Sequence, residues 1–583
     1  MSEYYPVSAN EFTMTQLAYN AAKYKQQLRG WLSYAFASEV FVIVSLTLFL
    51  PLCLEQFARD NGFLLPDKTQ PCSSRPGNET VVVTDEAARC VVKLGWAWID
   101  TASFSLYVNS ASVALQALTV ISMGGIADHP PHRKRLLLSF AFFGAASAIL
   151  FLALPSSSPI WPTSALLGIF ANVGFGASVV AMNAYIPTLA QDSEDVIQTL
   201  HELHEAQINV VPQVVDEPES AGADAPLLPR TLSTDISGNE ELTSLHAKYH
   251  ATLSATTSRI SSLGIALGYA AGIILLLLAL IPVTKLGGST FSLRLAIGLS
   301  GIWWAVFSLP AAVWLPSAAP PVRDDEHESS NGANRVQEDL DCQAKWNMGR
   351  EIVNAWKRLG GMLRWQEIKK LRNTFQYLAA WFLLSDGFTT ITSTAVLFAK
   401  TSLHMPPSSL ILIGVITPTS GILGSLVWPI IQRKFGWSNI RILVTLVVMA
   451  SCIPAYGCLG FLPVFKNGTV KFGGLTTPGE MFALAVYFGS VYGAFQGYAR
   501  AFYAELIPAG EEARWYGLFS ITDKSSSFVG PLAVGLIADM TGNIRYAFFF
   551  LVIMVWLAVP ILLSIDINRG RRDAREYVYR GSH

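Results

Sequence analysis

The sequence predicts an all-α membrane protein with twelve transmembrane helices arranged as two six-helix bundles. Only 14% of the 583 residues are charged, whereas 51% are hydrophobic, and the mean hydropathy is +0.38. Ordinary globular proteins carry roughly 25% charged residues, so this chain has too few to cover soluble domains of its size. The net charge of −1 provides no basic surface of the kind that nucleic acid binds. Six cysteines without paired CxxC spacing indicate neither a disulfide-framework miniprotein nor a metal site.

Twelve stretches are long and apolar enough to cross a bilayer as helices. About 20 apolar residues span the hydrocarbon core, and lipid offers a backbone amide no alternative to the helical hydrogen bond. The approximate spans are 31–54, 96–126, 136–154, 162–189, 259–283, 292–315, 375–399, 409–431, 442–464, 479–507, 516–538 and 544–565. The expected parts are an N-terminal tail (1–30), a first bundle (31–315) with an acidic insertion (191–258), a central linker (316–372), a second bundle (373–565) and a C-terminal tail (566–583).

Lys and Arg gather in flanks that the twelve spans place on one side of the membrane. This side and both termini are therefore predicted to be cytosolic. The cations are Lys23, Lys25, Arg29, Arg133, Lys134, Arg135, Arg433, Lys434, Arg441, Arg569, Arg571, Arg572 and Arg575.

The opposite side contains two candidate glycosylation sites and a candidate disulfide. The Asn-X-Ser/Thr acceptors Asn78 and Asn467 both fall in loops expected there. Cys72 and Cys90 share the first of these loops, where an oxidising lumen would permit a disulfide. Chance sequons and two free thiols are the alternatives.

Two cytosolic insertions interrupt the helical pattern. Residues 191–258 hold twelve acidic residues against Arg230 and Lys248, which predicts a disordered, phosphorylatable loop. Its segment His201–His204 resembles a zinc-protease pattern but is one residue too short, so no metal site is expected. The central linker ends as a basic amphipathic segment expected on the cytosolic membrane surface, with one apolar face formed by Ile352, Trp356, Leu359 and Leu363.

The two halves repeat local features. Ser38-Glu39 and Ser385-Asp386 place a Ser-acid pair at similar depth in the opening span of each half. Together with Ile-Pro at the end of both fourth spans, this echo favours related bundles around a central cavity, the architecture of a major facilitator transporter. Glycines at every fourth residue of the fifth and tenth spans predict close helix contacts. Gly124 to Asp128 followed by Arg133 fits, in degraded form, the gate motif of that superfamily, with ordinary positive-inside anchoring as the alternative.

Charges inside the expected spans are the candidate functional residues. A charge in lipid costs about 2.5 to 3.5 kcal/mol or more, so such a group must face a cavity or a partner. We expect Glu39 or Asp386 to link proton movement to substrate release, with structural pairing to a buried cation as the alternative. Arg500 beside these acids suits a zwitterionic amino acid, although a salt bridge between the bundles is the favoured interpretation of its role. The gate candidates are Asp128, Arg133, Glu505, Asp523 and Lys524, and further cavity candidates are Asp100, Asn109, Gln116, Asn172 and Asn183.

Several polar-bearing strings resemble the fungal autophagy-related vacuolar effluxers. They are Gly30–Tyr34, Ser38–Phe41, Asp100–Phe104, Ser385–Gly387, Thr392–Thr394, Phe519–Lys524, Asn543–Tyr546 and Arg569–Arg572. The resemblance extends from about residue 28 to 575 and excludes the two insertions. It implies a vacuolar membrane protein that returns amino acids from autophagic breakdown, Leu among them, to the cytosol during nitrogen starvation.

We therefore expect a transporter of small-molecule amino acids that works by alternating access, with no catalytic site, no cofactor and no metal. A major facilitator transporter of another small solute is the alternative. A membrane receptor, a scaffold and a membrane-bound enzyme are less favoured. Protein partners are left open.

Overall fold

The computed structural model describes residues 20–72, 89–127, 130–156, 158–210, 232–317, 348–466, 472–508 and 512–577. Within this part of the chain, ten segments are long and apolar enough to cross a membrane. They are Ala21–Asp60, Thr101–Gly124, His132–Ala153, Thr163–Gln191, Arg259–Lys285, Thr290–Trp314, Arg372–Thr401, Pro407–Phe435, Asn439–Leu459 and Ile544–Leu563. Each matches an expected span, so the prediction of an all-α membrane protein is confirmed.

The other two expected spans are also helical. Residues 479–507 form α17 (Pro478–Ala504), and residues 516–538 form α18 (Glu512–Ser526) and α19 (Val529–Thr541) with a break between them. Neither is among the ten apolar segments, so the count of twelve stays a prediction.

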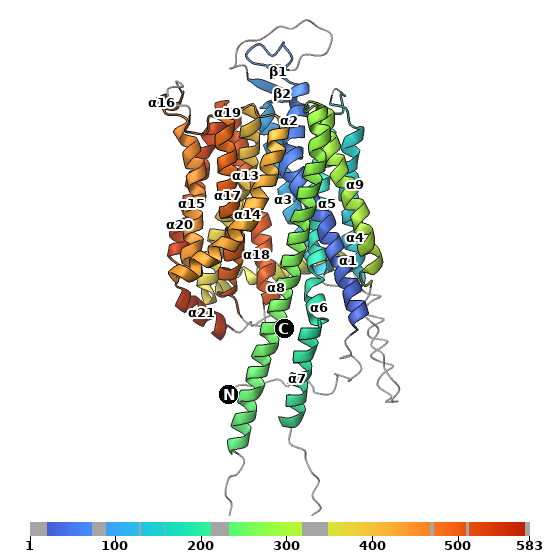
Figure 1. Cartoon of the computed structure of the whole chain (residues 1–583), viewed down its shortest axis with the longest axis vertical. Helices are drawn as coiled ribbons and strands as arrows, with labels where there is room; N and C mark the ends of the chain where they lie inside the picture. Colours follow the sequence, from blue (N-terminus) through green and yellow to red (C-terminus); the bar gives the residue numbers. More distant parts are fainter. Residues whose placement is uncertain are drawn as a thin grey trace, which may run out of the picture.

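The helices form two groups that lie side by side (Figure 1). In the first, α3, α4 and α5 pack on one another, and α1 packs on α8 and α9. The group consists of α1 (Ala21–Val40), η2 (Phe41–Phe49), α2 (Leu50–Asp60), α3 (Thr101–Ala127), α4 (Pro130–Leu150), η3 (Phe151–Ala153), α5 (Thr163–Asn183), α6 (Ile186–Gln191), α7 (Glu194–Val210), α8 (Leu232–Lys285) and α9 (Thr290–Trp314).

The second group is built around α13, which packs on α18, α19 and α20, while α17 packs on α14 and α15. It comprises α13 (Arg372–Thr401), α14 (Pro407–Phe435), α15 (Asn439–Leu459), α16 (Pro463–Lys466), α17, α18, α19, η4 (Ile544–Tyr546), α20 (Ala547–Leu563) and α21 (Ile567–Glu576). The linker contributes α11 (Met348–Met362) and α12 (Trp365–Lys370).

Glycines explain how closely these helices approach. A methyl group added at Gly489 or Gly493 of α17 would collide with the backbone of α14, at Thr417 and Gly421 respectively. Small residues at every fourth position let helix backbones meet in this way. The predicted close contacts are therefore present.

A small antiparallel sheet lies at one end of the helices, which we call the sheet end (Figure 1). Its strands are β1 (Phe63–Leu64), β2 (Cys90–Leu94) and β3 (Ala97–Asp100), in the order β1-β2-β3. A disulfide joins Cys72 to Cys90, the first residue of the central strand β2. The expected start of the second span at residue 96 is wrong, because Ala97–Asp100 pairs with β2 and α3 begins only at Thr101. The opposite end, where α1 begins and α21 lies, is the terminal end (Figure 1).

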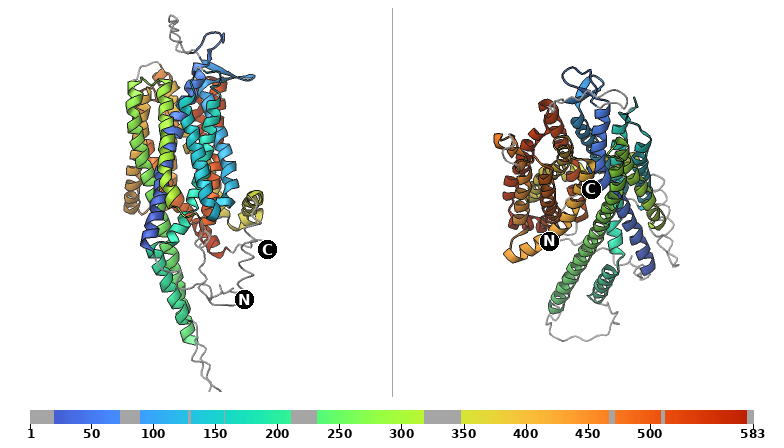
Figure 2. Two further views of the ribbon diagram at one scale, coloured as in Figure 1. Left: turned by 90° about the vertical axis from the view of Figure 1, so that its right-hand side faces the viewer. Right: turned by 45° about the horizontal axis from the view of Figure 1, so that its top comes forward.

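The prediction of disorder across 191–258 is wrong for most of its length. Residues 194–210 form α7, and residues 232–258 belong to α8. These two helices pack on each other beyond the bundle, where Val196 and Ile260 are buried and Lys248 Nζ lies 2.5 Å from Glu202 Oε2 (Figures 1 and 2). The acidic composition concealed this apolar contact, and residues 211–231 lie outside the described part of the chain.

Candidate functional site

Glu39 lies near the end of α1 and is positioned by a glycine of α8. A methyl group at Gly268 would collide with Cβ and Cγ of Glu39, so the glycine creates the space that this side chain occupies. The chain then widens into the π-helical η2 directly after Val40. Such wide turns occur often at functional sites. A side chain that the sequence places in a membrane span is thus held between two helices of the first bundle.

Two cations from the second bundle face Glu39. Arg500 of α17 and Lys524 of α18 both interact electrostatically with its carboxylate. In the described part of the chain, Glu39 forms no ion pair within 4 Å. Arg500 is exposed and the Lys524 side chain is 42% exposed. The three charges therefore interact across the interface between the bundles, and Glu39 forms no salt bridge with either cation.

Polar side chains from both bundles complete this group. Gln496 Nε2 donates to Tyr492 Oη at 2.9 Å, and Tyr492 interacts with Tyr269 of α8, with Asp523 and with Arg500. Asp523 accepts a hydrogen bond from Ser385 Oγ and lies 3.4 Å from Lys524 Nζ. We call the set the central cluster: Glu39, Tyr269, Tyr492, Arg500, Asp523 and Lys524.

Asp386, the other candidate for coupling, has a different position. It is 2% exposed, and its Oδ1 accepts hydrogen bonds from Gly530 N at 3.0 Å and Thr390 Oγ1 at 3.3 Å. Gly530 belongs to the first turn of α19, where backbone N–H groups lack helical partners. The carboxylate thus caps the helix that begins after the break. Among the described residues, no cation lies within 4 Å of it.

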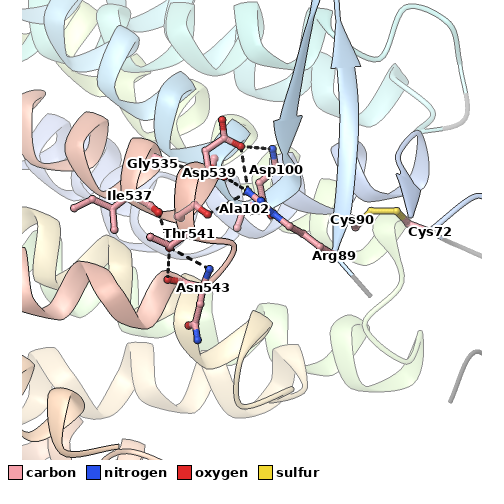
Figure 3. A network of polar contacts seen from close by, with 12 residues as sticks. Cys72, Arg89, Cys90, Asp100, Ala102, Gly535, Ile537, Asp539, Thr541 and Asn543 are labelled. Atoms are coloured by element: carbon pink, nitrogen blue, oxygen red, sulfur yellow. Dashed lines mark hydrogen bonds and ion pairs between the residues drawn. A yellow bond between two sulfur atoms is a disulfide. The ribbon is translucent and has the colours of Figure 1, made fainter. Parts of the chain in front are cut away.

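The sheet end is closed by charged contacts between the bundles. Arg89, next to the disulfide, donates to Asp100 Oδ2 at 3.0 Å and reaches Asp539 Oδ1 of α19 at 3.4 Å (Figure 3). Asp539 Oδ1 also accepts from Asp100 N at 2.9 Å. Asp100 is therefore part of this closure and not of the central cavity, which corrects its expected place in the second span.

Further contacts reinforce the closure towards the middle of the helices. Ser103 Oγ donates to Gly535 O at 2.9 Å, and Ser110 Oγ donates to Phe528 O at 2.7 Å. Beside them, Lys400 of α13 forms an ion pair with Glu55 of α2, whose side chain is 1% exposed. These hydrogen bonds and the ion pair join the two bundles at and near the sheet end.

Sequence patterns did not single out Glu55, Lys400, Asp539 or Arg89. A usable signal was present, because Glu55, Lys400 and Asp539 each directly follow the end of an expected span, at 54, 399 and 538. These ends belong to the same membrane side, where opposite charges can meet. Arg89 could not be found in this way, because its position depends on the unpredicted sheet.

The remaining gate candidates lie within single bundles at the terminal end. Arg133 Nε donates to Ala127 O at 2.9 Å, and its guanidinium lies 5.1 Å from the ring centre of Tyr185. Glu505 accepts from Arg571 Nη2 at 2.6 Å and from Asn439 Nδ2 at 2.5 Å. These contacts tie helices of one bundle together, whereas Asp128 lies outside the described residues.

The amide side chains expected to line the cavity also lie within a single bundle or near a helix end. Gln116 Nε2 donates to Asn172 Oδ1 at 3.0 Å, and Asn172 Nδ2 donates to Ser112 Oγ at 2.8 Å. This buried network joins α3 to α5 inside the first bundle. Asn109 is half-buried and Asn183 is exposed at the end of α5. The glycosylation candidates Asn78 and Asn467 lie outside the described residues.

Among solved structures, a bacterial homologue of the iron transporter ferroportin in an inward-facing state is similar with a TM-score of 0.49 at 12% identity, covering 95% of this chain and 99% of that chain. The inward-open xylose transporter XylE from E. coli gives 0.47 at 12% identity, covering 93% and 95%.

Sequence relatives are much closer. Autophagy-related protein 22 of Cryptococcus neoformans is 40% identical over 95% of this chain and 97% of its own length. Autophagy-related protein 22-1 of Neosartorya fischeri is 38% identical over 94% and 91%. The family model described as vacuole effluxer Atg22 like matches residues 23–575. The chain therefore belongs to the Atg22-like family of vacuole effluxers, which are membrane transport proteins of autophagy.

Proposed function

We propose that this protein exports amino acids released by autophagic degradation, Leu and other neutral amino acids, from the vacuole to the cytosol by alternating access. The family supports a vacuolar efflux transporter. The observation that carries the substrate assignment is Glu39 of the first bundle facing Arg500 and Lys524 of the second. A membrane-embedded group of one acid and two cations, contributed by opposite bundles, offers charges of both signs to one ligand.

A neutral amino acid presents a carboxylate and an ammonium group a few bonds apart. The Arg500 guanidinium can hold the carboxylate with two parallel hydrogen bonds. Glu39 and Asp523 can accept hydrogen bonds from the ammonium group. Because the two ends of the ligand bind side chains of different bundles, its binding favours an arrangement in which both bundles approach it.

The sheet end is assigned to the vacuolar lumen and the terminal end to the cytosol. The disulfide between Cys72 and Cys90 suits an oxidising compartment. The cations predicted to be cytosolic include Arg571 of α21, at the terminal end. The closing contacts at the sheet end and the exposed Arg500 support a state of the cycle that is open to the cytosol.

Proton coupling is assigned to Glu39 rather than to Asp386. Protonation of Glu39 would remove one acceptor for the ammonium group and so weaken substrate binding. Asp386 instead accepts a backbone hydrogen bond at the start of α19, an interaction independent of the ligand.

The test is leucine efflux from preloaded proteoliposomes containing the full chain, with and without an imposed pH gradient. Arg500→Gln removes a charge-assisted hydrogen bond worth about 1.5 to 3 kcal/mol, so efflux at low substrate should fall roughly tenfold or more. Glu202→Gln, a charge change on exposed α7, is the matched control and should leave efflux unchanged. Unchanged efflux by Arg500→Gln would refute the site, and movement of another solute without leucine would transfer the function to that solute.

A further inference from the structure

An apolar groove lies between α13, α18 and α20. It has a volume of about 390 Å³, which is within the usual range for ligand sites of about 300 to 1,000 Å³. Three spans and the linker form its walls: Phe375, Leu378, Ala379, Phe382 and Leu383 of α13, Leu518 and Thr522 of α18, Ile561 of α20, and Leu363 after α11. The Thr522 hydroxyl is already bonded to Leu518 O, so the lining is apolar.

The groove opens towards the terminal end beside two exposed cations. Arg372 begins α13 and lies one turn before Phe375, on the face that continues to Ala379. Arg364 directly follows the lining residue Leu363. In the described part of the chain, neither guanidinium has a carboxylate within 4 Å.

The neighbouring linker has the features of a segment at a membrane surface. Trp365 is 67% exposed, and Lys369 Nζ lies 5.7 Å from its ring centre. Tryptophan and cations are typical of the boundary between lipid tails and headgroups. The linker helices lie at the side of the bundle near the terminal end (yellow in Figure 2). The cationic mouth is thus placed at headgroup level and the apolar groove at the level of the acyl chains.

We propose that this groove binds one anionic phospholipid, with an acyl chain along α13 and the headgroup phosphate between Arg364 and Arg372. The lining residues of α13 from Phe375 to Leu383 extend about 12 Å along the helix, so they accommodate the part of an acyl chain nearest the headgroup. Negative charge on the headgroup complements two arginines that have no carboxylate partner among the described residues.

The site adjoins the transport machinery through α18. Thr522 lines the groove, and the next two residues, Asp523 and Lys524, belong to the central cluster. On α13, Leu383 lines the groove while Ser385 holds Asp523. The bound lipid therefore supports the helix that carries two charges of the cluster.

Native mass spectrometry of the purified full chain, with phosphatidylserine or phosphatidylcholine added in equal amounts, tests this site without relying on transport. Each cation near an anionic headgroup contributes roughly fivefold, so the wild type should retain one phosphatidylserine with roughly 30-fold preference. Arg364→Gln with Arg372→Gln should abolish the preference but leave weak binding of both lipids. Arg433→Gln with Lys434→Gln, the same charge change in the last turn of α14, is the control and should retain it.

Ala379→Trp provides an independent test of the groove itself, because Ala379 is exposed and its enlargement fills the space between α13 and α18. It should lose the bound lipid, whereas Leu426→Trp, on an exposed face of α14, should not. Equal retention of the two lipids by the wild type would overturn the proposal, as would full retention by Ala379→Trp. If Ala379→Trp does not fold, the paired arginine variant still decides the outcome.

Discussion

Arg89, the residue next to the disulfide at Cys90, reaches across the bundle interface to Asp539 of α19, 450 positions later in the sequence. The same carboxylate accepts the backbone N–H of Asp100, so one acid of the second bundle holds two parts of the sheet. These contacts hold the two bundles together at the sheet end, and they must break when that end opens. Arg89 is therefore the residue whose loss should open that end most directly.

Arg89→Gln is expected to increase the accessibility of the sheet-end interface about fivefold, the effect of about 1 kcal/mol for a half-buried ion pair. The measurement is the labelling rate of Ser103→Cys by a membrane-impermeant thiol reagent, in a chain whose cysteines outside the disulfide, Cys53, Cys342, Cys452 and Cys458, are replaced by Ser. Lys93→Gln on β2 is the control, since Lys93 lies over Trp98 and not at the interface. Equal labelling of both variants would contradict the closure.

Gly268→Ala is expected to abolish leucine efflux while the protein still folds and reaches the membrane. The added methyl group collides with Glu39 and must displace it from Arg500 and Lys524. Gly497→Ala is a matched control because a methyl group there meets nothing within 4 Å. Efflux and the amount of protein in the vacuolar membrane, measured in parallel, distinguish the two variants. Normal efflux by Gly268→Ala would show that the position of Glu39 is unimportant.

Asp386→Ala should destabilise the protein by about 1 kcal/mol, because it removes the acceptor for the first turn of α19. Asp386→Asn keeps an oxygen at that position and should be nearly neutral in thermal unfolding in detergent. It should also retain pH-dependent efflux, which Glu39→Gln should lose. Loss of pH dependence in Asp386→Asn alone would reverse the assignment of the two acids.

Replacing both Cys72 and Cys90 by Ser should lower the stability of the sheet by about 3 kcal/mol. The disulfide closes a loop with a sequence separation of 18, and removing it restores conformational freedom to the unfolded segment. Limited proteolysis at the sheet end should become faster, with the helical bundles unaffected. Unchanged proteolysis would show that β1–β3 holds without its covalent link.

The stability contributed by Asp100 at the sheet end is expected to increase as the pH falls, whereas most carboxylates in ion pairs lose stability on acidification. Burial raises the pKa of Asp100 above its ordinary value of 3.8, an effect that outweighs the hydrogen bond from Arg89. The folded state therefore binds a proton that the unfolded state releases, and stability gains from this group as the pH falls towards 3.8. Asp100→Asn should remove this gain in pH-dependent unfolding. A closure that instead weakens in the wild type over that range would contradict it.

The sequence predicted the helices better than their ends. Apolar length determines a membrane span, so nine expected spans reappear with ends within five residues, and the first, expected at 31–54, extends over Ala21–Asp60. The ends of the helices depend on local partners. Ala97–Asp100 pairs with β2, so these residues, Asp100 among them, do not belong to the second span. The acidic composition of 191–258 led to a wrong prediction of disorder at α7, because acidic residues outnumber the few apolar residues that pack against α8.

A charged residue in an expected membrane span indicated well which side chains lie at the interface between the bundles. It indicated poorly what each side chain does there. Glu39 interacts electrostatically with Arg500 and Lys524, as a pattern of opposite charges favours. Asp386 shares the depth and the preceding serine of Glu39, yet it caps a helix. That difference depends on the break between α18 and α19, which hydrophobicity alone does not reveal.

The length of α8 has a mechanical consequence. From Leu232 to Lys285 it is one uninterrupted rod of 54 residues, about 80 Å from tip to tip. Its N-terminal turns project beyond the bundle beside α7 (Figure 1). Gly268, which packs against Glu39, belongs to the same helix. A partner that binds the projecting part of α8 outside the membrane could tilt the whole helix and so shift the Glu39 carboxylate that packs on Gly268.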